Sequence, residues 1–199
     1  MKRIICLGDS NTYGRDPHSF IGSRYREDIR WTSKLQDAGF DIVNLGMNGR
    51  TVPGRHEGKK LCSLIQKYEP ADLLLIMLGT NDILRGYSAS ETAAKAEKFL
   101  IQVRENTSVP VLFVAPPHLR EGSWVTSQKM IDASRNLSSA YEAVAEKLDT
   151  AFCDAGDWAV GLASDGVHLS SQGNQVFYEG IFEAICRMYK EINESEVRE

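Results

Sequence analysis

The residues best suited to chemistry are a serine near the start of the chain and an Asp-x-x-His segment near its end. Ser10 follows a short apolar run in the segment Gly8-Asp9-Ser10, and Asp165 and His168 lie three residues apart. A serine hydroxyl needs an adjacent base to act as a nucleophile, and a histidine held by a carboxylate is the usual base. The pattern predicts that His168 activates Ser10 and that Asp165 orients His168.

Both parts of this arrangement also have simpler explanations. Serine and aspartate favour helix caps and turns, so Asp9 and Ser10 alone indicate only a turn. An isolated Asp-x-x-His is more often a turn aspartate followed by a packed or surface histidine. The catalytic interpretation therefore depends on the other group that acyl transfer needs, a set of donors for the developing oxyanion.

Candidate oxyanion donors follow the second and third apolar runs of the chain. Gly49 allows a substrate to approach its backbone N–H closely, and Asn81 offers a side-chain amide. The backbone N–H of Ser10 completes the set. A tight turn at Gly49 and a helix cap at Asn81 are the alternatives.

The elements that must position these residues alternate between strand and helix. Strands are predicted at 4–7, 40–45, 73–78, 110–115 and 150–154. Helices are predicted at 31–38, at 56–67, at 90–105 with Ser90 as its cap, at 130–148, and after a cap at Ser170 or Ser171. This order predicts an α/β fold, a flavodoxin-like three-layer α/β/α sandwich with a five-stranded parallel sheet. The carboxyl ends of its strands share one edge, where we expect Ser10, Gly49 and Asn81 to converge.

Length, charge and cysteine content narrow the class of protein. The 199 residues suit one domain, 1–199, with a charged tail from about residue 191 that we expect to fray. A net charge of −4 gives no reason to expect nucleic-acid binding. No apolar run approaches the roughly 20 residues of a membrane span, and because the first predicted strand begins almost at Met1, we expect no signal peptide. The four cysteines form no Cys-x-x-Cys pair, so we expect reduced thiols, no metal, no cofactor and a cytoplasmic location.

Four blocks of the sequence resemble those of the SGNH, or GDSL-type, hydrolases. In chain order they are Gly8-Asp9-Ser10, Gly49, Gly79-Thr80-Asn81-Asp82 and Asp165-Gly166-Val167-His168. Each block is weak alone, but their order and spacing match over essentially the whole chain. The resemblance implies that Ser10 is the nucleophile, His168 the base and Asp165 the third triad member. It also implies an oxyanion hole of Ser10, Gly49 and Asn81, and it leaves Asp9 as local support.

Within that family the chain is most similar to the small arylesterase-like intracellular esterases. The similar segments are 30–32, 76–82, 115–117 and 152–156. The chain departs from the family pattern at Asn11, where leucine is usual, and we expect an altered pocket lining there with intact catalysis. Tyr13, His118 and Trp124 are the other expected pocket residues, each with ordinary packing as its alternative. Related enzymes form multimers through loops that are compact here, so assembly into a homo-oligomer stays open.

The resemblance implies the SGNH hydrolase fold and the activity of a serine esterase on small-molecule esters. We expect hydrolysis of small aryl or acetyl esters through an acyl-serine intermediate, with acyl transfer as a side activity. The alternative is a deacetylase of acetylated carbohydrates, or a lipase- or thioesterase-type acyl hydrolase with the same triad. A non-catalytic α/β binding module is disfavoured because all five polar roles have a candidate residue.

Overall fold

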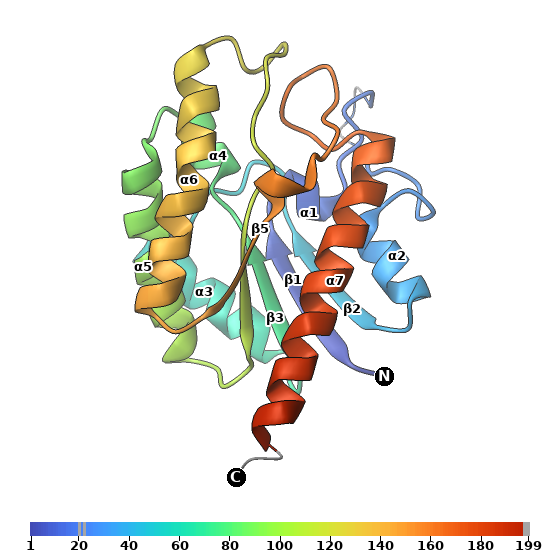
Figure 1. The fold of residues 1–199 in the computed structure, drawn as a ribbon, viewed down its shortest axis with the longest axis vertical. Helices are drawn as coiled ribbons and strands as arrows, with labels where there is room; N and C mark the ends of the chain where they lie inside the picture. Colours follow the sequence, from blue (N-terminus) through green and yellow to red (C-terminus); the bar gives the residue numbers. More distant parts are fainter. Residues whose placement is uncertain (20, 22, 197–199) are drawn as a thin grey trace.

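A parallel sheet forms the centre of the molecule (Figure 1). The structure, a computed structural model, describes residues 1–19, 21 and 23–196. Its strands are β1 Arg3–Gly8, β2 Asp41–Gly46, β3 Leu73–Met77, β4 Val111–Ala115 and β5 Ala151–Asp154. They lie in the order β2-β1-β3-β4-β5, and every neighbouring pair is parallel. The predicted five-stranded parallel sheet is confirmed.

Helices cover both faces of this sheet. One face carries α3 (Arg55–Gln66), α5 (Ala89–Arg104) and α6 (Gln128–Lys147), and the other carries α2 (Trp31–Asp37) and α7 (Ser171–Glu196). Helices α3 and α5 pack against each other, as do α5 and α6 and, on the other face, α2 and α7. Figure 1 shows α7 crossing the front of the sheet with α2 beside it. The three layers of the predicted sandwich are present.

The central strands are apolar without interruption because they contribute to two cores at once. Successive side chains of a strand point to opposite faces. In β1, Ile5 and Leu7 enter the core beneath α3, α5 and α6, whereas Ile4 and Cys6 enter the core beneath α2 and α7. All four are fully buried. Continuous hydrophobic runs of this kind are typical of parallel strands covered on both faces.

Serine side chains cap the starts of α5 and α7, though the cap of α5 is not the expected serine. The cap of α5 is Ser88, whose Oγ accepts a hydrogen bond from Glu91 N–H, so the prediction of Ser90 is wrong. Glu91 in turn accepts from the backbone N–H of Ser88, which completes a capping box. At the start of α7, Ser170 Oγ accepts from Gly173 N–H at 2.9 Å.

Three short helices were not predicted, and each follows a strand directly. They are α1 (Ser10–Tyr13), α4 (Thr80–Leu84) and the 3₁₀ helix η1 (Ala155–Trp158). Helix α1 lies against the end of β2, where a Cβ on Gly46 would come within 2.1 Å of Tyr13 N. Glycine at this position therefore allows β2 to end directly against the helix that begins with Ser10.

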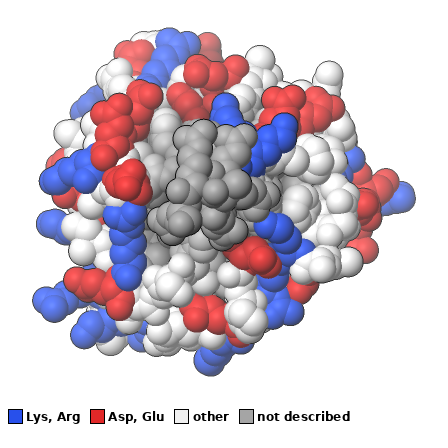
Figure 2. All heavy atoms as spheres, turned by 60° about the horizontal axis from the view of Figure 1, so that its bottom comes forward, with Lys and Arg blue, Asp and Glu red and all other residues white. Residues whose placement is uncertain are grey.

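Positive and negative side chains are mixed on the surface, in agreement with the low net charge. Figure 2 shows Lys and Arg side chains interspersed with Asp and Glu on the lower face of the molecule. Among the described residues, no helix is both long and apolar enough to cross a membrane. The tail expected to fray from residue 191 begins inside α7, which continues to Glu196, and residues 197–199 lie outside the described part of the chain.

Candidate active site

Four segments that are distant in the sequence meet at the carboxyl edge of the sheet. Helix α1 follows β1, a turn containing Gly49 follows β2, and α4 follows β3. The fourth segment, 159–170, leads from η1 into α7 and is the orange loop near the top of Figure 1. Hydrogen bonds connect the first of these segments to the fourth and the second to the third.

Ser10, His168 and Asp165 form a continuous row of hydrogen-bonding groups. His168 Nε2 lies 3.0 Å from Ser10 Oγ, and His168 Nδ1 lies 2.6 Å from Asp165 Oδ2. The three residues are buried, with 4%, 1% and 7% of their surfaces exposed. A nucleophile, a general base and an orienting carboxylate need this order of contacts.

A tight turn lets Asp165 bond to its own histidine. Gly166 has a φ of 79°, in the left-handed region that favours glycine, and a Cβ there would lie 2.2 Å from Arg120 O. Asp165 Oδ1 accepts from the backbone N–H groups of Val167 and His168, each at 2.9 Å. Burial acts to raise the pKa of Asp165, but its hydrogen bonds from His168 and Val167 outweigh burial and lower the pKa to about 2. Asp165 is therefore ionised at neutral pH.

Asp9 is a second buried carboxyl group, directly beside Ser10. Its Oδ1 accepts from Asn11 N–H at 2.9 Å and so caps α1, while its Oδ2 lies 3.4 Å from Asn81 Nδ2. Burial raises the pKa of Asp9 to about 6, against hydrogen bonds and the charges of His168 and Arg50, which lower it. These bonds connect α1 to α4 and leave His168 Nδ1 to Asp165.

The two other expected oxyanion donors lie on adjoining segments. Gly49 has a φ of 72°, so the turn after β2 uses a conformation that glycine adopts readily. Asn81 Nδ2 donates to Arg50 O at 3.0 Å, and Arg85 Nη2 donates to Gly49 O at 3.3 Å. These bonds fix the Gly49 turn against α4, with the Asn81 amide between that turn and Asp9.

Arg50 is a site residue that the sequence did not single out. It is buried, and its Nη1 donates to Gly8 O at 2.8 Å and to Leu45 O. Burial lowers its pKa from the ordinary arginine value. Arg50 thereby ties the end of β1 to the end of β2, one residue before the Asp9-Ser10 pair. An arginine in a polar turn is normally exposed, so the sequence contained no signal for this role.

The structure corrects the expectation that Asn11 lines the pocket. Asn11 is only 4% exposed, and its side-chain amide is bonded to the backbone on both sides of His168. Nδ2 donates to Val167 O at 3.2 Å, and Oδ1 accepts from Leu169 N–H at 3.0 Å. The side chain therefore faces the interior.

The other three pocket candidates fall in different places. Trp124 is 51% exposed and lies edge-on to His168, with ring centroids 5.1 Å apart. Its backbone N–H donates to Asp165 O at 3.1 Å. Tyr13 ends α1 with its ring under the Arg24 guanidinium. His118 is not placed beside His168: its Nε2 lies 3.1 Å from Ser138 Oγ on α6, and its ring packs on Gly156. Of the three, Trp124 is the one that contacts the Ser10-His168-Asp165 row, through the His168 ring and the Asp165 carbonyl.

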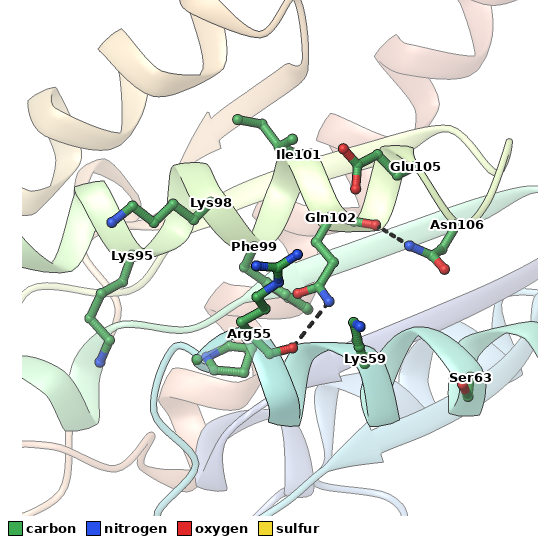
Figure 3. A pocket seen from close by; sticks show the side chains of 12 residues that line it. Arg55, Lys59, Ser63, Lys95, Lys98, Phe99, Ile101, Gln102, Glu105 and Asn106 are labelled. Carbon is green, nitrogen blue, oxygen red and sulfur yellow. Dashed lines mark hydrogen bonds between the residues drawn. The ribbon is translucent and has the colours of Figure 1, made fainter.

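A separate surface groove of about 790 Å³ lies between α3 and α5 (Figure 3). Its described lining includes four cationic side chains and none of the candidate active-site residues; the cations are Arg55, Lys59, Lys95 and Lys98. Gln102 Nε2 donates across the groove to Arg55 O at 3.1 Å (Figure 3). Within the described residues, no group of three His, Cys, Asp or Glu side chains is arranged to hold a metal ion.

Comparisons with known proteins agree on the class of this chain. Residues 6–176 match the model of the GDSL-like lipase/acylhydrolase family. An aryl esterase from M. smegmatis has a similar structure, with a TM-score of 0.82 and 26% identity over 94% of this chain and 99% of that one. A putative arylesterase from Agrobacterium tumefaciens gives 0.81 and 28% over 94% and 99%. A carbohydrate acetylesterase from Sinorhizobium meliloti gives 0.80 and 27% over 94% and 100%. Among curated proteins, none matches.

The raised pKa of Asp9 predicts a pH-dependent cost to stability. Its pKa is about 6 in the folded protein against an ordinary value of 3.8, so ionising Asp9 destabilises the fold as the pH rises from about 4 through 6. Asp9→Asn keeps an oxygen that can cap α1 and removes the ionisation. Thermal unfolding measured in this pH range should show the variant gaining stability relative to the native protein as the pH rises. A difference in Tm that stays constant between pH 4 and pH 7 would contradict the assignment.

Proposed function

This chain belongs to the GDSL-like lipase/acylhydrolase family, and we propose that Ser10 is the nucleophile with which it hydrolyses small carboxylic esters. The family resemblance stated from the sequence is thereby confirmed. Family membership, together with esterases of the same fold at 26–28% identity, identifies the protein as a carboxylic ester hydrolase. The residue roles and the preferred ester are the parts that we propose.

The observation that carries the proposal is the buried row of Ser10, His168 and Asp165. Two hydrogen-bonding distances of 3.0 Å and 2.6 Å join the hydroxyl to the imidazole and the imidazole to the carboxylate. The low pKa of Asp165, about 2, keeps a negative charge beside the imidazole at neutral pH. That charge favours the imidazolium that forms when His168 accepts the serine proton.

The reaction follows from these roles in two halves. Ser10 Oγ attacks the ester carbonyl carbon as its proton moves to His168 Nε2, giving a tetrahedral oxyanion. His168 then returns the proton to the leaving alcohol as the C–O bond breaks, which leaves an acyl-serine. Water repeats the sequence, giving its proton to His168 and releasing the carboxylic acid and Ser10. An alcohol in place of that water would give acyl transfer.

The oxyanion is stabilised by the backbone N–H groups of Ser10 and Gly49 and by the Asn81 amide. This assignment is supported by Asn81 Nδ2, which lies 3.0 Å from Arg50 O, one residue after Gly49. The bond to Arg50 O uses one amide hydrogen and holds the group in place before substrate binds, and the second hydrogen, whose contact with Asp9 Oδ2 is long at 3.4 Å, is the one that turns to the oxyanion. Donors fixed in advance stabilise a developing charge more than donors that must reorganise.

Trp124 is proposed to form one wall of the substrate site. Its ring is half exposed and lies edge-on to His168, so an ester whose carbonyl reaches Ser10 passes close to an apolar surface. An aromatic leaving group can pack on such a ring. This favours aryl esters as substrates.

A cytoplasmic location is also proposed, supported by four cysteines that form no disulfide.

Deacetylation of carbohydrates is the second candidate function. It is favoured by the similarity to a carbohydrate acetylesterase from Sinorhizobium meliloti, at 27% identity over 94% of this chain. The two functions share the triad and differ in the leaving group that the site accepts. The rim of the site, and not the triad, must therefore decide between them.

Removing the nucleophile should abolish turnover. Ser10→Ala is expected to lower kcat by roughly 10⁴–10⁶, because the remaining groups cannot form the acyl-enzyme. A fluorophosphonate probe should label the native protein and not the variant. Ser138→Ala is the matched control, since Ser138 also bonds to a histidine, His118, and the hydrogen bonds of the described residues do not connect it to Ser10, Asp165 or His168. Near-normal turnover by Ser10→Ala would refute the role of Ser10.

Removing the Asn81 amide should weaken the oxyanion hole. Asn81→Ala is expected to lower kcat by about 10²–10³ with little change in KM, because the amide acts on the charge that develops in the transition state. Asn136→Ala, a change of an exposed asparagine on α6, provides the control. An unchanged kcat for Asn81→Ala would remove Asn81 from the proposed oxyanion hole.

A substrate panel should decide between the two functions. We expect kcat/KM for phenyl acetate and p-nitrophenyl acetate to exceed that for peracetylated sugars, because Trp124 offers an aromatic ring an apolar contact. Trp124→Ala should reduce this preference. Faster release of acetate from the sugars, measured under the same conditions, would favour the carbohydrate deacetylase.

A further inference from the structure

We propose that Asn11 is a positioning residue for the general base, fastening the backbone that carries His168 to the helix that carries Ser10. This inference rests on the proposed function, because it takes His168 to be the base. The expectation from the sequence was that this side chain lines the pocket, and the similar structures assign it no role. Its interest is that one residue, next to the nucleophile, would set the distance between nucleophile and base.

The contacts of Asn11 span His168 from both sides. Its Nδ2 donates to the carbonyl of the preceding residue, Val167, and its Oδ1 accepts from the N–H of the following residue, Leu169. The two distances are 3.2 Å and 3.0 Å. A primary amide has one donor face and one acceptor face, so it matches this pair of backbone groups with both bonds made in one rotamer.

Asn11 is itself held firmly by its own backbone. Its N–H donates to Asp9 Oδ1 at 2.9 Å, and its carbonyl accepts from the indole N–H of Trp31 at 2.9 Å. Trp31 is fully buried, and Asn11 is 4% exposed. The side chain therefore transmits the position of α1, which begins with Ser10, to the segment that carries the base.

The hydrogen bonds of Asp165 do not replace the two hydrogen bonds that Asn11 makes to Val167 and Leu169. Asp165 accepts from the N–H groups of Val167 and His168, so it holds the amino side of the base and the imidazole. Asp165, however, belongs to the same loop as His168 and moves with it. Asn11 provides the connection from that loop to Ser10, together with the 3.0 Å contact of His168 Nε2 with Ser10 Oγ, which a reacting substrate disrupts.

The proposal also gives a physical meaning to the departure from the family pattern. Leucine, the usual residue at this place, has similar volume but neither donor nor acceptor. A leucine here would leave Val167 O and Leu169 N–H without the amide that they bond in this chain. Unsatisfied buried backbone groups are costly, so the loop would shift to find other partners.

The test substitutes the amide while preserving its size. Asn11→Leu removes both bonds, and Asn11→Asp keeps the acceptor for Leu169 N–H but loses the donor to Val167 O. Because displacing a base by about 1 Å can cost on the order of 100-fold, we expect kcat to fall about 10- to 100-fold in Asn11→Leu. KM should change little. Asn11→Asp should also lose kcat at a pH where its new carboxyl group is ionised, because a charged oxygen then faces Val167 O in place of the donor. The rate of fluorophosphonate labelling of Ser10 should fall in parallel, since it reports activation of the nucleophile.

Asn44→Leu is the matched control for a purely structural effect. Asn44 makes a comparable pair of bonds: its Nδ2 donates to Thr12 O at 2.7 Å, and its Oδ1 accepts from Gly46 N–H at 2.9 Å. Neither bond reaches the segment that carries His168. Assayed well below its Tm, this variant should keep the native kcat. The proposal is overturned if Asn11→Leu retains native kcat, or if Asn44→Leu loses kcat and labelling rate to the same extent.

The outcomes also separate this inference from the proposed function. If Asn11→Leu does not fold, Asn11→Asp decides, because a native kcat in that variant at a pH where its new carboxyl group is ionised overturns the donor role. If Ser10→Ala remains active, the nucleophile itself is misassigned. If Ser10→Ala is inactive while both Asn11 variants turn over normally, the esterase mechanism stands and the positioning role is wrong.

Discussion

The structure depends on one contact between the beginning and the end of the chain. Ser10 and His168 are 158 residues apart in sequence and meet at 3.0 Å. To bring them together, the loop before α7 must return over the carboxyl end of β1, which lies between β2 and β3. The parallel sheet makes this possible, because every strand delivers its following segment to the same edge. The position of α7 on the opposite face from α6 then fixes where that loop descends.

Two buried carboxyl groups at the site have pKa values that are shifted in opposite directions. Asp165 receives hydrogen bonds from two backbone N–H groups and from His168, so it stays ionised despite burial. Asp9 lies deeper and burial dominates, which raises its pKa. The difference assigns the permanent negative charge to the group that faces the imidazole. The carboxyl group adjacent to Ser10 in sequence serves instead to hold α1 and α4 together.

The residues that surround Ser10 and His168 are buried and hydrogen-bonded, whereas the rim of the site is exposed. Asp9, Arg50 and Asn11 are buried and each bonds to a different neighbouring segment. Trp124 is half exposed beside His168. A fixed interior suits a reaction that every ester requires, and an exposed rim can change with the leaving group. This division is consistent with aryl esterases and a carbohydrate acetylesterase having structures similar to this one.

The sequence by itself determined the five strands, the three layers and the residues Ser10, Gly49, Asn81, Asp165 and His168 as site candidates. It could do so because apolar periodicity and strand-end polarity are local signals, and because a parallel sheet brings strand ends together. The sequence did not indicate the contacts of Asn11, Arg50 and His118. Each of these side chains bonds to a partner that is distant in the sequence: Asn11 to Val167, Arg50 to Gly8, and His118 to Ser138. Whether a polar side chain faces a pocket or the interior depends on which distant backbone groups need a partner, and only the tertiary structure decides that.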